Sequence, residues 1–260
     1  MGENLRILVT GGTGVFGRKA VALLLAGGHE VRVFTRRTAP ILPPRAIPFR
    51  GDLSRGEGVG TAVEGAEAIL HAASNTGPGL GRGDVEGTRH LLEAAKGAGV
   101  RHLLYVSIVG IDRIPLSYYR RKLACERRIA ESGIPYTILR ATQFHELLAG
   151  GLRKVERWPL APLPLSWKFQ PVAAEEVASR AVDLLERAVP GRAPDFGGPE
   201  VLTLREMVAV WRSVRGRGPR AMPLPMFGTV AKGFREGGNT CPERADGRRT
   251  WAEFVRATTA

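Results

Sequence analysis

The sequence is poor in cysteine, and this scarcity excludes two kinds of protein. Cys125 and Cys241 are the only cysteines among 260 residues. They stand far apart without the spacing of metal ligands, so neither a zinc site nor a disulfide framework is expected. We therefore predict no bound metal, and the two unpaired thiols indicate a reducing, cytoplasmic environment.

Long apolar runs are also lacking. The longest, AVALLLAGG, falls far short of the roughly 20 residues needed to span a bilayer. The apolar RILVT near the start is too short for a secretory signal. These two absences predict no membrane partner.

Basic residues outnumber acidic ones, and they are not concentrated in one segment. The formal net charge is +13. The basic residues are spread along the chain and do not interleave with aromatic residues in any run, so no nucleic-acid partner is expected. A basic surface instead favours an anionic small-molecule ligand.

Short apolar runs alternate with helical patterns through the first half of the chain. Strands are predicted at LRILVT, HEVRVFTR, AIPFRGDL, AEAILHAAS, VRHLLYVSIVG and YTILRA. Helical segments such as EGTRHLLEAAKGAG lie between them and end at glycine. This alternation predicts an α/β fold with a parallel sheet covered on both faces.

The texture changes after about residue 150. RWPLAPLPLSWKFQPV is rich in proline and tryptophan, which predicts a loop that leads into a strand at KFQPV. An amphipathic helix follows at AAEEVASRAVDLLERA. Two further helices are predicted to begin after the N-cap residues Thr203 and Thr250.

A glycine-rich loop carries the strongest functional signal. In TGGTGVFGR, Gly11, Gly14 and Gly17 follow the spacing GxxGxxG between the first predicted strand and helix. Such glycines allow a tight turn, close approach of the backbone to a pyrophosphate, and close contact of helix and strand. The free N–H groups at the helix N-terminus then face the phosphates. This context predicts a dinucleotide-binding site.

The end of the second predicted strand bears on the choice of dinucleotide. Sites for NAD usually place an acid there for the ribose 2′-hydroxyl, but this sequence has VFTRRT. Arg36 and Arg37 suit a 2′-phosphate instead, which predicts NADP(H) in preference to NAD(H). Asp52, after the third strand, is a candidate acceptor for the adenine amino group, and its alternative role is that of a turn residue.

Four segments together, TGGTGVFG, RGDL, HAAS and YYRRK, resemble the short-chain dehydrogenase/reductase family. The resemblance is to its atypical and extended branch, which includes NmrA-like NAD(P)-binding proteins. LRATQFHE, FQPVAAEEVA and GGPEVLTLREM extend it over nearly the whole chain.

This resemblance implies a Rossmann-type doubly wound parallel sheet with a small C-terminal substrate-binding region. Residues 1–150 would form the NAD(P)-binding Rossmann core. Residues 151–260 would form a mixed segment that returns one strand and one helix to the core and supplies the substrate-binding region. The residues expected to bind the cofactor come from the glycine loop, the ends of the second, third and fourth predicted strands, and the YxxxK segment. They are Gly11, Thr13, Gly14, Val15, Phe16, Gly17, Arg36, Arg37, Asp52, Leu53, Ala72, Ala73, Ser74 and Lys122.

The resemblance also implies a catalytic pair. Tyr118 and Lys122 match the YxxxK motif of the family, and on a helix residues four apart share one face. Lys122 would bind the nicotinamide ribose, and Tyr118 would pass a proton to or from a substrate oxygen. Tyr119 has Leu123 four residues on and therefore lacks the lysine. Ser107 is the candidate third catalytic residue.

The substrate side is predicted from residues beyond the sixth strand. Gln143, Phe144 and His145 would line the nicotinamide end of the site, with Trp158 and Trp167 as parts of an apolar lid. For these residues the alternatives are capping or surface positions and ordinary packing.

The leading prediction is an NADP-dependent oxidoreductase acting on a small, fairly apolar carbonyl or quinone-like substrate. Two alternatives stay open, a non-catalytic NADP-binding sensor and an NAD(P)-dependent epimerase or dehydratase. The protein is expected to be a monomer or a homodimer.

Overall fold

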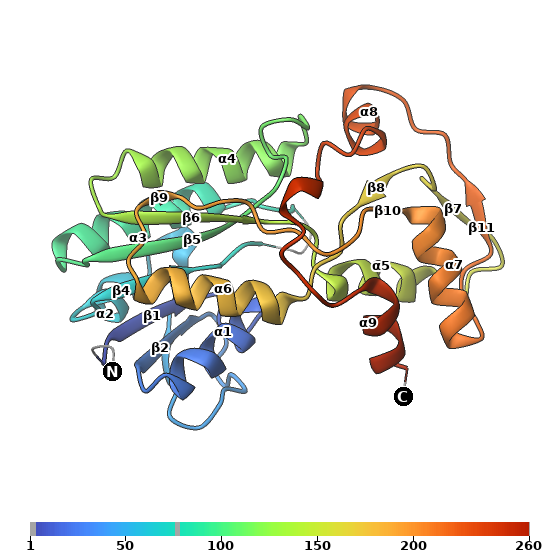
Figure 1. Ribbon diagram of the computed structural model, residues 1–260. Coiled ribbons are helices and arrows are strands. Elements are labelled where there is room, and N and C mark those ends of the chain that lie inside the picture. Colours follow the sequence, from blue (N-terminus) through green and yellow to red (C-terminus); the bar gives the residue numbers. More distant parts are fainter. Residues whose placement is uncertain (1–3, 76–78, 260) are drawn as a thin grey trace. The chain divides into compact units, whose positions relative to one another are not determined.

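The computed structural model describes residues 4–75 and 79–259 (Figure 1). Its chain divides into two compact units that alternate along the sequence. Unit 1 holds Met1–Ser107, Arg120–Leu139 and Ala178–Ala193, and unit 2 holds Ile108–Tyr119, Arg140–Val177 and Pro194–Ala260. The predicted division at residue 150 separates a cofactor-binding part from a substrate-binding part, and it stays a prediction.

The central sheet contains seven strands in the described residues, in the order β3-β2-β1-β4-β5-β6-β9. The strands are β1 (Arg6–Thr10), β2 (Glu30–Thr35), β3 (Ile47–Arg50), β4 (Ala68–His71), β5 (His102–Ile108), β6 (Tyr136–Ala141) and β9 (Gly191–Arg192). The chain runs outward from β1 to β3, then returns to β4 and runs outward the other way. The order therefore reverses between β1 and β4, the position at which open α/β sheets bind ligands. This arrangement confirms the predicted Rossmann-type fold.

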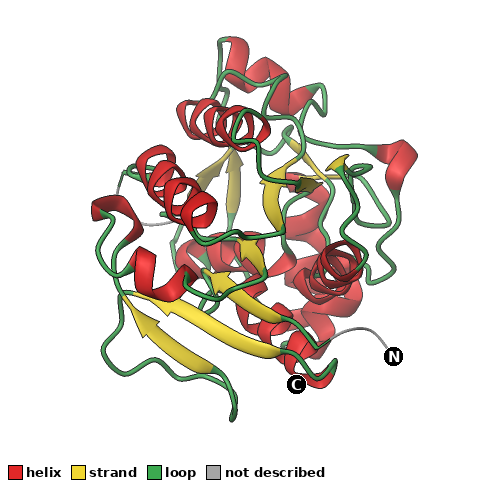
Figure 2. Ribbon diagram, turned by 90° about the vertical axis from the view of Figure 1, so that its left-hand side faces the viewer, coloured by secondary structure: helices red, strands yellow, loops and turns green. Residues whose placement is uncertain are grey.

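Helices cover both faces of this sheet (Figures 1 and 2). They are α1 (Val15–Ala26), α2 (Val59–Val63), α3 (Asp84–Gly97), α4 (Ser117–Ala130) and α6 (Ala174–Glu186), with a short 3-10 helix η1 (Leu53–Arg55) after β3. On one face, a single buried cluster joins the sheet to α2, α3 and α4 through residues such as Leu8, Leu91 and Ile129. On the other face, His29 beyond α1 contacts Glu186 at the end of α6, with 3.0 Å between Nε2 and Oε1.

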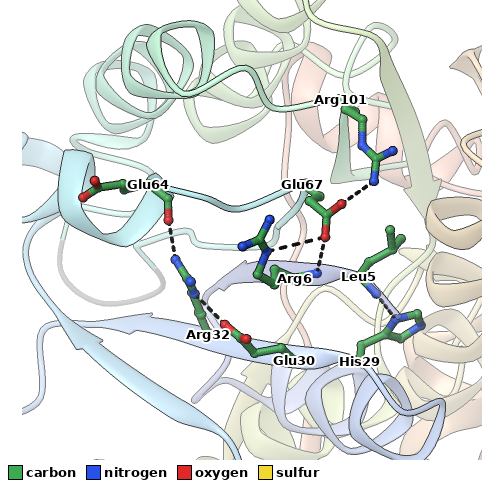
Figure 3. Close-up of polar contacts among 8 residues, drawn as sticks. All are labelled: Leu5, Arg6, His29, Glu30, Arg32, Glu64, Glu67 and Arg101. Atoms are coloured by element: carbon green, nitrogen blue, oxygen red, sulfur yellow. Dashed lines mark hydrogen bonds and ion pairs between the residues drawn. The ribbon is translucent and has the colours of Figure 1, made fainter. Parts of the chain in front are cut away.

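Ion pairs join the strands at the amino ends of the sheet (Figure 3). Glu67, just before β4, accepts a hydrogen bond from the backbone N–H of Arg6 at 3.0 Å and pairs with the side chains of Arg6 and Arg101. Because these residues stand at the starts of β1, β4 and β5, their charges tie three strands together. The carboxyl ends of the same strands are left for the glycine loop and its neighbours.

Unit 2 combines helices with two small sheets. Its elements are α5 (His145–Val155), β7 (Ala161–Leu163), β8 (Lys168–Phe169), β10 (Leu202–Thr203), α7 (Leu204–Arg215), β11 (Ala221–Pro223), α8 (Thr229–Arg235), the 3-10 helix η2 (Pro242–Arg244) and α9 (Trp251–Ala257). Trp211 and Trp251 are fully buried and stack at 6.0 Å within a cluster of α5, α7 and α9. Thr203 and Thr250 form capping boxes with Glu206 and Glu253, which confirms both predicted N-caps.

None of the described helices is both long and apolar enough to cross a membrane.

Candidate functional site

The glycine loop lies at the carboxyl end of β1, where the strand order reverses. Gly11 has φ +74°, and a Cβ there would stand 2.7 Å from the backbone of Ala72. A Cβ on Gly17 would stand 2.1 Å from the carbonyl oxygen of Gly11. Both positions therefore require glycine, and their closeness confines the turn between β1 and α1. Gly14 caps α1 with φ −79°, so its own conformation does not demand glycine.

The first turn of α1 begins at Val15 and Phe16. Val15 is exposed and Phe16 is buried, and no acidic residue occupies this turn. Thr13 accepts a hydrogen bond from the side chain of Arg18 through its carbonyl oxygen at 3.3 Å. The first N–H groups of a helix have no partner within the helix, and no carboxylate of this turn competes for them, which suits a pyrophosphate. The loop thus fits the predicted dinucleotide.

A buried hydrogen-bond chain connects this loop to β4 and α3. Thr10 Oγ1 lies 2.7 Å from His71 Nδ1, and His71 Nε2 lies 3.1 Å from Thr88 Oγ1. The backbone N–H of Ala73 donates to Thr10 Oγ1, and the Thr88 hydroxyl donates to the carbonyl of Asp84.

These end points fix the direction of every bond in the chain. Since the Thr88 hydroxyl already donates to Asp84, its oxygen accepts from His71 Nε2–H. His71 Nδ1 then carries no proton and accepts from the Thr10 hydroxyl. Burial, helped by the charge of Lys122, lowers the pKa of His71 from 6.5 to about 3. The imidazole is therefore neutral, as this bond pattern requires.

His71 is a residue that sequence reasoning missed, although it opens the quoted HAAS segment. The signal was an ionisable side chain at the end of an otherwise apolar buried strand. Of the other HAAS residues, Ala72 and Ala73 pass so close to Gly11 that a Cβ on Gly11 would stand 2.7–2.8 Å from their backbone atoms. Ser74 donates to a carboxylate oxygen of Asp84 at 2.5 Å. The structure thus brings HAAS and the glycine loop together.

Lys122 reaches the same region from α4. Its side chain is buried, and Nζ donates to the carbonyl oxygen of Val106 at 2.9 Å and lies 4.1 Å from the centre of the Tyr105 ring. Burial lowers the pKa of Lys122 to about 8, although neighbouring groups such as Asp84 oppose the shift. The ammonium keeps its charge at neutral pH and has two further protons to donate.

Ser107 follows Val106 at the end of β5. Its hydroxyl is buried and has no hydrogen-bond partner among the described residues. An unpaired buried hydroxyl is costly and marks a position to be explained by a ligand or a catalytic role.

The two tyrosines at the start of α4 differ in environment. Tyr119 is buried, its ring centre lies 6.3 Å from that of Phe234 in a tilted arrangement, and burial raises its pKa well above 10. Tyr118 is partly exposed. This difference favours Tyr118 for proton transfer and Tyr119 for packing.

The predicted adenosine end of the site combines two exposed arginines with a carboxylate. Arg36 and Arg37 are exposed after β2, and the charge of Arg36 is one cause of a lowered pKa of Asp52. The largest cause is the hydrogen bond from Ser54, whose hydroxyl and N–H donate to Asp52 Oδ1 at 2.7 and 2.8 Å. Asp52 thus caps η1, which is the alternative role of a turn residue. Leu53 is partly buried and packs against the core.

The predicted substrate residues of unit 2 lie in several environments. His145 is fully buried and stacks 4.9 Å from Phe254, and neither of its nitrogens has a hydrogen-bond partner within residues 4–75 and 79–259. Burial lowers its pKa to about 4. Gln143 is buried in an amide network, in which its Oε1 accepts from Asn239 Nδ2 at 3.2 Å. These environments favour packing for both residues.

The remaining three aromatic residues do not form one surface group. Trp167 stacks on Phe234 at 4.4 Å, and Trp158 is half exposed. Phe144 is partly exposed and precedes α5 as its N-cap.

Comparison with known proteins places this site in context. A family model described as NAD(P)H-binding matches residues 11–187. The chain is 31% identical over 228 residues to a (4-alkanoyl-5-oxo-2,5-dihydrofuran-3-yl)methyl phosphate reductase from Streptomyces griseus, which covers 81% of this chain and 74% of that protein. It is 26% identical over 237 residues to photosystem II assembly factor Ycf39 from Trieres chinensis, and the match covers 86% of this chain and 73% of that protein. The chain spans only 31% of the length of another relative, a 3-beta-hydroxysteroid dehydrogenase from Mycolicibacterium neoaurum.

Among solved structures, the fold is similar to that of an NADPH-dependent quinone oxidoreductase from Escherichia coli in complex with NADPH. The TM-score is 0.79 at 20% identity, over 97% of this chain and 99% of the other. At this identity the likeness shows the fold alone.

Proposed function

Because the chain belongs to the NAD(P)H-binding family, we propose that it is an NADPH-dependent oxidoreductase that acts on a small, fairly apolar carbonyl or quinone-like compound. The observation that carries this proposal is the environment of Lys122. A buried, charged amine is held by the carbonyl oxygen of Val106, one residue before Ser107, whose hydroxyl has no hydrogen-bond partner in the described part of the chain, at the strand ends where the glycine loop lies. Buried amines with a lowered pKa are characteristic of functional sites.

In this proposal each residue has one task. Lys122 binds the ribose hydroxyls with its two remaining protons, and its charge stabilises an anionic oxygen on Tyr118. Ser107 donates a hydrogen bond to the substrate oxygen, and Tyr118 gives its phenolic proton to that oxygen as the carbonyl carbon is reduced. The bound nicotinamide supplies the hydride. Arg36 and Arg37 hold the 2′-phosphate.

Turnover is tested by screening carbonyl and quinone compounds while following NADPH absorbance. Wild type is compared with Tyr118→Phe and with the matched control Tyr119→Phe. We expect Tyr118→Phe to lower kcat by about 100-fold or more, the usual worth of a positioned acid, while Tyr119→Phe retains turnover. Equal rates for wild type and Tyr118→Phe would refute the proton-transfer role.

Cofactor choice is tested separately by fluorescence titration. Loss of one charge-assisted bond to the 2′-phosphate costs about 1.5–3 kcal/mol, so Arg36→Ala should weaken NADPH binding about tenfold or more and leave NADH binding unchanged. Arg55→Ala, whose side chain is 70% exposed in the same unit, is the control. Tighter binding of NADH than of NADPH by wild type would contradict the proposed preference.

A second candidate function rests on the burial of Ser107. Its hydroxyl is inaccessible to solvent, and Val109 two residues on is fully buried. Such a site suits a protein that binds NADPH and reports its presence without turning over a substrate. Tight NADPH binding with no turnover in a broad screen would select this function over the first.

A further inference from the structure

Large apolar side chains are exposed in one part of unit 2. They lie on β11 and in the segments that adjoin β7 and β11 (Figure 1). They are Trp158, Leu160, Met222, Leu224, Met226 and Phe227. Phe227 is 86% exposed. Exposed apolar residues are common singly, but a group on adjacent segments indicates an interaction surface.

Strand register places several of these side chains on one side. β7 and β11 pair in parallel, with Ala221 opposite Ala161 and Met222 opposite Pro162. Ala221 and Leu163 face inward and pack against the cluster of α5, α7 and α9. Because successive residues of a strand point to opposite sides, Pro162 and Met222 face outward.

The chain on either side of the paired strands extends this surface. Ala161 N–H donates to the carbonyl of Arg220, and Leu224 N–H donates to that of Leu163. The alternation therefore carries Leu160 and Leu224 onto the outward side. We use the name β7–β11 face for these exposed residues and their exposed neighbours in the adjoining segments. They are Trp158, Leu160, Met222, Leu224, Met226 and Phe227.

Only basic charge accompanies the β7–β11 face. Between Met207 and Arg235 the sequence has six basic residues and no acidic one. From Arg157 to Ala174 it again has no acidic residue. The nearby Glu156 is only 10% exposed and pairs with Arg215 at 3.0 Å.

Exposed cations remain at this surface. Arg157 and Arg220 are exposed, and neither forms an ion pair with any described residue. Arg217 is 65% exposed and lies 3.7 Å from Glu156. The apolar side chains are thus bordered by guanidinium groups and by no exposed carboxylate on the same segments.

We propose that the β7–β11 face docks on an anionic lipid surface. Stable attachment to a bilayer surface takes two signals, and apolar side chains that enter the interface together with basic ones that meet the headgroups can supply them. Both are present here, with Trp158 and Phe227 among the apolar group. A protein partner would have to supply acidic groups fitted to each arginine, whereas an anionic bilayer meets them in any arrangement. The missing apolar run excludes a spanning segment and does not bear on surface contact.

Vesicle sedimentation tests this docking on the full chain, with and without NADPH. We expect binding to phosphatidylcholine vesicles that contain one quarter phosphatidylglycerol, weak binding to pure phosphatidylcholine, and loss of binding at high salt. Arg220→Gln should lower the partition coefficient about fivefold, the worth of one cation at such a surface. Phe227→Ser should lower it about tenfold.

Matched controls separate this face from general stickiness. Ile41 is 88% exposed in unit 1, and Ile41→Ser should bind vesicles as wild type does. Because all substituted side chains are exposed, circular dichroism and thermal unfolding should match wild type. No binding of wild type to the anionic vesicles, or equal binding by Phe227→Ser, would overturn the proposal.

The competing occupant is a second copy or another protein. Sedimentation velocity that shows a dimer lost in Phe227→Ser, without binding to vesicles, would assign the face to self-association and overturn the lipid proposal. Neither experiment depends on turnover or on cofactor choice, so the docking proposal and the proposed function can fail independently.

Discussion

Replacing His71 by phenylalanine removes both ring nitrogens from the chain that links the glycine loop to α3. The hydroxyl of Thr10 then has no acceptor at His71 Nδ1, and the oxygen of Thr88 loses the Nε2–H donor. Each buried group left unpaired costs about 1–3 kcal/mol. For the two groups together, we therefore expect His71→Phe to lower the free energy of unfolding by about 2–6 kcal/mol at neutral pH.

The loss should shrink in acid. Burial lowers the pKa of His71 from 6.5 to about 3, so the unfolded chain takes up the proton first. The stabilisation by neutral His71 is thus complete above pH 6.5 and declines as pH falls towards 3. At about pH 5 the unfolded state gains roughly 2 kcal/mol from this one proton, since each unit of pKa difference is worth 1.36 kcal/mol. The phenylalanine variant has no such proton, so its loss of stability relative to wild type falls to about 0–4 kcal/mol at this pH.

Urea unfolding of wild type and variant at both pH values measures this double difference. Other titrating groups contribute equally to the two proteins and cancel. His71→Gln is the control, because its amide offers a donor and an acceptor without titrating. It should cost less than phenylalanine at neutral pH. A disadvantage of His71→Phe that is the same at both pH values would refute the assignment of a neutral, hydrogen-bonded imidazole.

Three further predictions concern single positions. NADPH affinity, measured by fluorescence, should fall as pH rises through about 8, where Lys122 loses its charge, and Lys122→Gln should abolish this inflection. Gly17→Ala should reduce NADPH affinity at least tenfold, since its Cβ would collide with Gly11 and displace the loop; a variant that binds normally would show that the loop geometry does not matter. Thr250→Ala should lower the free energy of unfolding by about 1 kcal/mol through loss of the α9 cap, whereas Thr250→Ser should retain most of it.

Most of the sheet was predictable from local patterns. All six predicted strands of the first half occur, because each is a short apolar run followed by a turn or a glycine-closed helix. The resemblance implied that one strand after residue 150 returns to the core, but the position of β9 was not predicted, since Gly191–Arg192 has neither length nor apolar character and pairs with β6 only through its tertiary position. α8 was missed because RGRGPR and the prolines after it obscured the helical pattern of Thr229–Arg235.

The candidate site was predictable where backbone geometry dictates residue type. Gly11 and Gly17 could be read directly, because only glycine fits such close approaches. The burial of Gln143 and His145 could not be read, since their neighbours Asn239 and Phe254 lie about a hundred residues further along the chain. The roles proposed for Tyr118, Lys122 and Ser107 stay predictions, and the structure supplies the environments in which to test them.

The interleaving of the two units constrains how the protein can be made. β9 and most of α6 reach the sheet only after unit 2 has received residues 140–177. On the ribosome, the central sheet is therefore completed only when the chain has emerged as far as Ala193. A fragment ending at residue 150 lacks an edge strand and a covering helix, and it exposes the apolar face that α6 conceals. During synthesis this face therefore stays uncovered until α6 has emerged, and transiently exposed apolar surface of this kind favours aggregation.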